Sequence, residues 1–135
     1  MARMSPSQGE GRGFESRLSL LNIYDKYMIG EIVKIIVDRP MGSVHPKHPN
    51  IKYSVNYGYV EGVIGGDGEE QDVYILGPEK PLKEWTGKII AIIHRNNDTE
   101  EKWVAAPEGV DFTDEEILEK THFQEQYYDI EIRRE

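Results

Sequence analysis

The stretch GGDGEEQDVYIL, from Gly65 to Leu76, contains four carboxylates within six residues: Asp67, Glu69, Glu70 and Asp72. Glycines before and among these acids allow the backbone to turn sharply enough to bring their side chains together. Crowded carboxylates repel one another, and a hard cation such as Mg²⁺, which prefers oxygen ligands, would relieve that repulsion. The spacing of Asp67, Glu69 and Asp72 therefore suits a metal site. A polar hairpin tip has the same composition, so the stretch alone leaves both interpretations open.

A second acidic turn, NNDTEEK, places Asp98 and Glu100 just before Lys102. Its carboxylates could add oxygen ligands to the first set, and its lysine could bind an anion as a point charge. A hairpin tip again explains the same residues.

Basic side chains gather in one segment of this otherwise acidic chain, DRPMGSVHPKHPNIKY. Arginine can bind phosphate through two parallel hydrogen bonds, whereas lysine acts as a point charge. The segment is therefore a candidate anion clamp, or else a solvated loop stiffened by its prolines. The residues are Arg39, His45, Lys47, His48 and Lys52.

Tyrosines are concentrated in YSVNYGY and FQEQYY, which include Tyr57 and Tyr127. A tyrosine hydroxyl can donate to a phosphate oxygen or orient a water, although aromatic packing in the core is the commoner use. The chain has no cysteine, no nucleophilic-serine elbow and no P-loop, so covalent catalysis by serine or cysteine is not supported. Metal-assisted attack of water on a phosphate is the chemistry that these side chains suit.

The elements that must position these groups are mostly strands. Apolar, β-branched runs separated by glycine- and proline-rich turns predict strands over residues 29–38, 51–64, 71–77, 87–95 and 102–107. A capping box from Thr113 to Glu116 predicts a helix over 114–128, with Ile117, Leu118, Thr121 and Tyr128 on its inward side. Five short strands followed by one helix favour a mainly β (α+β) fold, a closed barrel with one C-terminal helix.

The charge balance limits the partners. The chain of 135 residues has a formal net charge of −9, which argues against a nucleic-acid partner. No apolar run approaches the length of a membrane span, so a cytoplasmic protein without a membrane partner is expected.

Residues 1–27 are expected to lie outside the fold, which leaves 28–135 as one domain. The segment lacks a sustained apolar period, and its GFES can be encoded by GGTTCGAATC, which resembles the T-arm of a tRNA gene. One hypothesis is that the segment is translated upstream DNA and that Met28 is the true start. An ordinary disordered leader is the alternative.

The stretch YSVNYGYVEGVIGGDGEEQDVYIL resembles the soluble, Mg²⁺-dependent (family I) inorganic pyrophosphatase family. That family has a Tyr-Pro-x-Asn-Tyr-Gly-Tyr sequence before an Asp-Gly-Asp-Pro-x-Asp-Val signature. Weaker matches extend the resemblance over residues 28–135. It implies a five-stranded OB-fold-like barrel, Mg²⁺ as cofactor, pyrophosphate as substrate and a homo-oligomer.

The resemblance also implies roles for individual residues. Asp67, Glu69 and Asp72 would bind Mg²⁺, with Asp98 and Glu100 as further ligands and Asp38 as an acid near the metals. Asp72 would also deprotonate the attacking water, near Tyr57. Phosphate would be bound by Lys47, Lys102 and Tyr127, and Arg39 and Lys52 of the basic segment are expected to assist.

Four features depart from the family pattern. Glu69 replaces an aspartate, the segment between Lys47 and Tyr53 is short, and Tyr128 stands where lysine is usual. The second acidic turn is also shortened, so that Asp98 (or Asn97) and Glu100 stand roughly where the family has two aspartates. The expected function is Mg²⁺-dependent hydrolysis of pyrophosphate to two phosphates. The alternatives are a weakly active or inactive relative that binds phosphate, pyrophosphate or a nucleotide, and an enzyme that hydrolyses another phosphoanhydride.

Overall fold

The computed structural model describes residues 29–65, 68–96 and 100–134. The segment 1–27, Met28, Asp67 and Asp98 lie outside these ranges, so the predictions made for them stay predictions.

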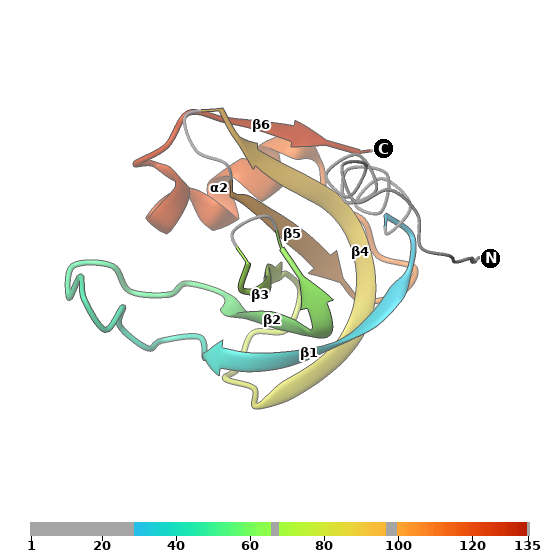
Figure 1. The fold of residues 1–135 in the computed structure, drawn as a ribbon, viewed down its shortest axis with the longest axis horizontal. Coiled ribbons are helices and arrows are strands. Elements are labelled where there is room, and N and C mark those ends of the chain that lie inside the picture. Colours follow the sequence, from blue (N-terminus) through green and yellow to red (C-terminus); the bar gives the residue numbers. More distant parts are fainter. Residues whose placement is uncertain (1–28, 66–67, 97–99, 135) are drawn as a thin grey trace.

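The described residues form a closed barrel with a helix against one side (Figure 1). The strand order is β1-β2-β3-β5-β4-β6, and pairing of β1 with β4 closes the barrel. β3 and β5 pair in parallel, and the other pairs are antiparallel. The predicted fold class, a mainly β five-stranded closed barrel with a C-terminal helix, is confirmed. The bounds are β1 Ile32–Arg39, β2 Asn56–Ile64, β3 Glu70–Ile75, β4 Glu84–Arg95, β5 Glu101–Ala106, α2 Asp114–Glu125 and β6 Ile130–Arg133.

Element ends differ from the predictions for identifiable reasons. Residues 51–55 are buried in part but form no regular ladder, only a bridge between Val44 and Lys52, so the predicted strand 51–64 begins at Asn56. β4 begins three residues early because its first half pairs with β1. β6 was not predicted; it is a four-residue strand that extends the sheet beside β4.

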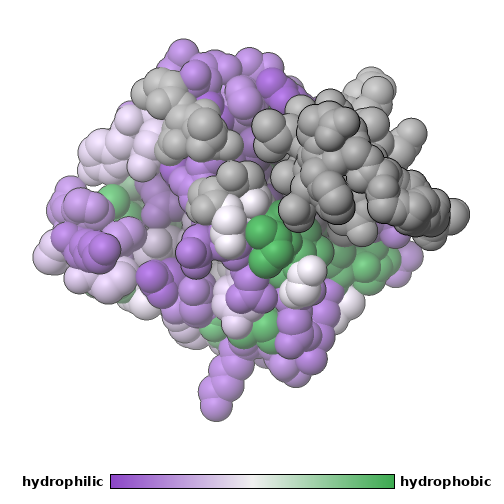
Figure 2. Space-filling view, viewed as in Figure 1, coloured by the Kyte–Doolittle hydropathy of each residue, from purple (hydrophilic) through white to green (hydrophobic). Residues whose placement is uncertain are grey.

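Two apolar clusters lie on opposite faces of the central strands. Val73 and Trp103 belong to one, which also contains residues of β1, and Tyr74 and Val104 belong to the other. This alternation follows from the two-residue period of a strand. Ile117 of α2 packs in the second cluster, so the helix covers the outer face of the barrel. The side of the molecule shown in Figure 2 is mainly hydrophilic.

The capping box of α2 is confirmed. The Glu116 amide donates to Thr113 Oγ1 at 3.1 Å, and the Thr113 amide donates to Glu116 Oε1 at 2.8 Å. The predicted inward side of the helix was partly wrong: Ile117 and Thr121 are buried, but Leu118 and Tyr128 are exposed. The helix ends at Glu125, and its remaining buried side chains are the polar Gln124 and Glu125. Among the described residues, no helix is both long enough and apolar enough to cross a membrane.

Gly58 allows β1 and β2 to approach each other closely. A Cβ at this position would lie 1.9 Å from the carbonyl oxygen of Ile36, a backbone atom that cannot move alone. We expect Gly58→Ala to lower the free energy of unfolding by about 3 kcal/mol because the strands must separate. Urea denaturation measures the change. Gly109→Ala is the control, since its surroundings are open and only its positive φ is strained, at about 1 kcal/mol. Equal losses in both variants would contradict the steric explanation.

Candidate active site

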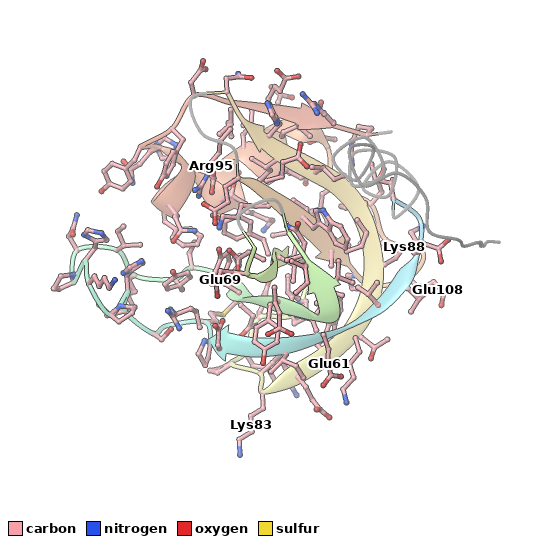
Figure 3. All side chains as sticks on the ribbon, in the orientation of Figure 1. Glu61, Glu69, Lys83, Lys88, Arg95 and Glu108 are labelled. Carbon is pink, nitrogen blue, oxygen red and sulfur yellow. The ribbon has the colours of Figure 1, made fainter. Side chains whose placement is uncertain are left out.

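A cleft of about 600 Å³ opens between the 39–53 segment, the barrel strands and the end of α2. The 39–53 segment projects from the barrel beyond the end of β1 (Figure 1). In Figure 3, Arg95 lies near α2, whereas Lys83, Lys88 and Glu108 lie toward the periphery. The cleft is lined by Asp38, Arg39, His45, His48, Asn50, Ile51, Tyr53, Tyr57, Asp72, Arg95, Glu100, Lys102, Gln124, Tyr127 and Tyr128.

Lys102 lies between two carboxylates at the base of this cleft. Its Nζ donates to Asp72 Oδ2 at 2.6 Å and to Glu100 Oε2 at 2.8 Å. The parallel pairing of β3 with β5 explains the first contact, because Val73 is in register with Trp103 and the preceding residues, Asp72 and Lys102, are therefore neighbours. The Lys102 side chain is only 5% exposed, so these two carboxylates take the place of water around its ammonium group.

Arg95, at the end of β4, connects this group to the helix. Its Nε and Nη2 donate to the two oxygens of Glu125 at 3.0 and 2.6 Å, and its Nη1 donates to Glu100 Oε1 at 3.1 Å. The guanidinium also lies 3.6 Å from the centre of the Tyr128 ring. Burial lowers the pKa of Arg95, but the hydrogen bonds and charge of Glu125 outweigh that effect and raise it. Arg95 therefore stays charged at any physiological pH.

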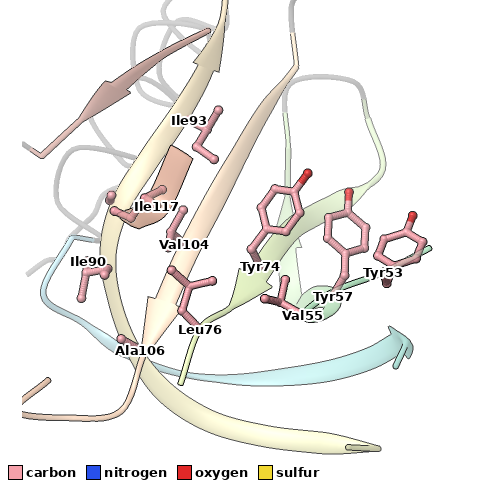
Figure 4. Close-up of a cluster of buried hydrophobic side chains, with 11 residues drawn as sticks. Tyr53, Val55, Tyr57, Tyr74, Leu76, Ile90, Ile93, Val104, Ala106 and Ile117 are labelled. Atoms are coloured by element: carbon pink, nitrogen blue, oxygen red, sulfur yellow. The ribbon is translucent and has the colours of Figure 1, made fainter. Parts of the chain in front are cut away.

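Two tyrosines and a glutamine extend the polar network beneath the cleft. Tyr74 donates to Glu125 at 2.6 Å and accepts from Gln124 Nε2 at 2.7 Å, and Tyr53 donates to Gln124 Oε1 at 2.9 Å. Figure 4 shows the hydroxyls of Tyr53, Tyr57 and Tyr74 pointing to one side, at the edge of the apolar cluster. The strand alternation that buries the rings of Tyr57 and Tyr74, which pair across β2 and β3, thus also places their hydroxyls on one side.

Tyr57 and Asp38 have pKa values that differ from their ordinary ranges. Burial, and then the charge of Asp72, raise the pKa of Tyr57 well above normal, so its hydroxyl remains a hydrogen-bond donor. Burial also raises the pKa of Asp38; Arg39 opposes this shift and Asp72 adds to it. In both cases burial is the largest cause and Asp72, which lines the same cleft, adds to it, so further negative charge in the cleft is costly.

The cleft brings together seven of the predicted site residues: Asp38, Arg39, Tyr57, Asp72, Glu100, Lys102 and Tyr127. Lys47, Lys52 and Glu69 are exposed and are not among the lining residues. Asp67 and Asp98 are outside the described ranges.

Sequence reasoning missed Arg95, Gln124 and Glu125. Arg95 ends an apolar strand directly before the second acidic turn, which is a weak signal for a charge buried beside that turn. Gln124 and Glu125 gave no signal, because polar residues near a helix end are normally exposed.

The donor chemistry of the cleft fits a hard cation such as Mg²⁺. Its acidic groups are carboxylates from β1, β3 and the start of β5, and carboxylate oxygens are the ligands that Mg²⁺ prefers. Within 29–65, 68–96 and 100–134, no group of three or more His, Cys, Asp or Glu side chains is arranged to hold a metal ion. Asp67 and Asp98, two of the five predicted ligands, lie outside those ranges.

Comparison with solved structures finds inorganic pyrophosphatases. The enzyme from Ehrlichia chaffeensis superposes with a TM-score of 0.59 at 17% identity, covering 76% of this chain and 85% of that one. The enzyme from Neisseria gonorrhoeae has a TM-score of 0.58 at 19% identity, covering 73% of this chain and 74% of that one. The enzyme from Thermus thermophilus has a TM-score of 0.53 at 14% identity, covering 77% of this chain and 83% of that one.

These similarities show that the chain has the fold of bacterial inorganic pyrophosphatases. No family model matches the sequence, and no curated protein matches it. At these identities the likeness extends to the fold and not to the activity.

Proposed function

We propose that the protein hydrolyses inorganic pyrophosphate to two phosphates in the cleft around Lys102, with Mg²⁺ as cofactor. The observation that carries this proposal is the convergence of Asp72, Glu100 and Lys102 in one cleft of a pyrophosphatase-like barrel. A base and a further acid are thereby each gathered within hydrogen-bond distance of a cation that can bind phosphate.

Each group has a role that follows from its charge and position. The oxygen of the attacking water bonds to phosphorus while Asp72 accepts a proton from that water. The bridging P–O bond breaks as the new bond forms. Tyr57 keeps its proton and donates a hydrogen bond at the reacting centre. Lys102 and Arg39 bind phosphate oxygens, and Tyr127, which also lines the cleft, is a further candidate. Lys47 and Lys52 stay candidates from the sequence and lie outside the lining.

Mg²⁺ would be held by Asp67, Glu69, Asp72, Asp98 and Glu100. When bound, it would supply positive charge for the phosphates and a more acidic water.

Release of phosphate from pyrophosphate tests the proposal. We expect turnover in millimolar MgCl₂ and loss of at least about 100-fold in excess EDTA, as is usual where a metal supplies the charge stabilisation. Colorimetric detection of phosphate measures the rate. Activity that is unchanged by EDTA would contradict the role of the metal. A panel of nucleoside triphosphates separates pyrophosphate from other phosphoanhydrides.

Binding without turnover is a second candidate function, and one observation favours it. The carboxylates of Asp72 and Glu100 are already paired with Lys102 and Arg95, and a carboxylate held in an ion pair is a weaker base and a weaker metal ligand. Calorimetric binding of Mg²⁺-pyrophosphate with no phosphate release would select this function.

A further inference from the structure

The Lys102 ammonium occupies a position that has the character of a cation site. Two carboxylate oxygens, one from β3 and one from the residue that precedes β5, converge on it: Asp72 Oδ2 at 2.6 Å and Glu100 Oε2 at 2.8 Å. The Tyr57 ring lies 5.6 Å away and offers its electron-rich face. The ammonium therefore sits where negative charge is concentrated.

The same two carboxylates are among those proposed to bind Mg²⁺. An ammonium this close to both oxygens and a divalent cation repel each other, so the two cannot be bound there together without cost. Arg95 does not compete in this way, because it contacts the other oxygen of Glu100 and is fixed by Glu125.

We propose that Lys102 is an internal counter-ion that Mg²⁺ must displace, and that displacement frees its ammonium to bind phosphate. The inference rests on the proposed metal site. One lysine then has two positions: between Asp72 and Glu100 in the metal-free protein, and on the anion once metal is bound. Metal binding promotes anion binding, and linkage requires the anion to promote metal binding equally.

Removal of the lysine charge gives two effects of opposite sign. Lys102→Gln should bind Mg²⁺ at least about 5-fold more tightly, since unit charges about 4 Å apart interact by at least that factor even in water. It should bind methylenediphosphonate, a non-hydrolysable pyrophosphate analogue, at least about 5-fold more weakly in saturating Mg²⁺. Isothermal titration with MgCl₂ alone and then with the analogue measures both.

Two variants control for general charge effects. Lys102→Arg keeps a cation at the position and should leave Mg²⁺ affinity close to that of the parent. Arg39→Gln removes a cation that lines the cleft beside Asp38 but does not contact Asp72, and its effect on Mg²⁺ affinity should be smaller than that of Lys102→Gln. An equal gain in Lys102→Gln and Arg39→Gln, or a loss of Mg²⁺ affinity in Lys102→Gln, would overturn the inference.

The unmodified protein offers a test that does not depend on a variant that folds. The Lys102 side chain is 5% exposed and held between two carboxylates, so amine-directed reagents reach its nitrogen slowly. If Mg²⁺ displaces Lys102, added MgCl₂ should increase the rate of its reductive methylation at least about 5-fold, the same factor as expected for Mg²⁺ affinity. Mass spectrometry measures the extent of methylation. The exposed Lys34 and Lys80 serve as unchanged references.

Failure of the inference and failure of the proposed function have different signatures. Mg²⁺-dependent hydrolysis with no change in Lys102 labelling overturns the displacement alone. Absence of Mg²⁺ binding in both the parent and Lys102→Gln overturns both.

Discussion

Asp72→Asn is expected to slow release of phosphate from pyrophosphate by about 10²–10⁴-fold, the usual loss when a general base is removed. The amide cannot accept the proton of the attacking water, although its size and position are those of the aspartate. The rate at saturating pyrophosphate and Mg²⁺ measures the effect. We expect kcat to fall more than KM changes, because the proton transfer takes place in the transition state.

Stability and charge must be controlled in this comparison. Lys102 retains Glu100 as a partner in Asp72→Asn, so a thermal melt should show a folded protein. Glu61→Gln removes an exposed carboxylate of β2 outside the cleft and should leave the rate unchanged. An Asp72→Asn variant that keeps more than a tenth of the activity would require a different base.

Glu125→Gln is expected to lower the free energy of unfolding by about 3–5 kcal/mol, the cost of breaking a buried ion pair from one side. Glu125 and Arg95 have side chains that are 2% and 4% exposed, and loss of the carboxylate leaves the buried guanidinium with Glu100 alone. Urea denaturation at neutral pH gives the change. The exposed pair of Lys34 and Glu84 is the control, and Lys34→Gln should cost less than about 1 kcal/mol.

The double variant Glu125→Leu, Arg95→Met separates charge burial from general damage to the fold. Replacing a buried pair by apolar side chains is often close to neutral, so the double variant should be more stable than Glu125→Gln. If the double variant is less stable, the packing of these side chains and not their charge is what holds α2 to the barrel.

The strands of the barrel were predicted well because the sequence patterns that mark them are local. Apolar runs bounded by glycine, proline and acidic turns located the first five strands, and Thr113 with Glu116 located the start of the helix. β6 was missed because four alternating residues after a helix carry little signal. The early start of β4 was missed because Glu84 to Thr86 belong to a strand only through β1, a partner about fifty residues away in the sequence.

Most of the predicted residues that the cleft brings together lie on strands or in the turns beside them. Asp72, Glu100, Lys102 and Tyr57 are such residues, and they line one cleft. Lys47 and Lys52 were predicted from their charge in a basic segment. Charge alone does not determine whether a side chain points into the cleft, and both residues are exposed. Arg95 and Glu125 are 30 residues apart in the sequence, and their pairing follows from packing of α2 on the barrel, which no short motif encodes.

The parallel pairing of β3 with β5 makes the relative position of Asp72 and Lys102 independent of the loop that borders the cleft. The spacing of Asp72 and Lys102 is fixed by backbone hydrogen bonds of two central strands, so it does not depend on the length of the 39–53 segment. Tyr53 in that segment is part of the core, whereas residues 46–50 are exposed and can change in length without altering the acid and the lysine. If the proposed function holds, replacement of this exposed part should change which phosphate compounds are accepted while Asp72 and Lys102 stay in register.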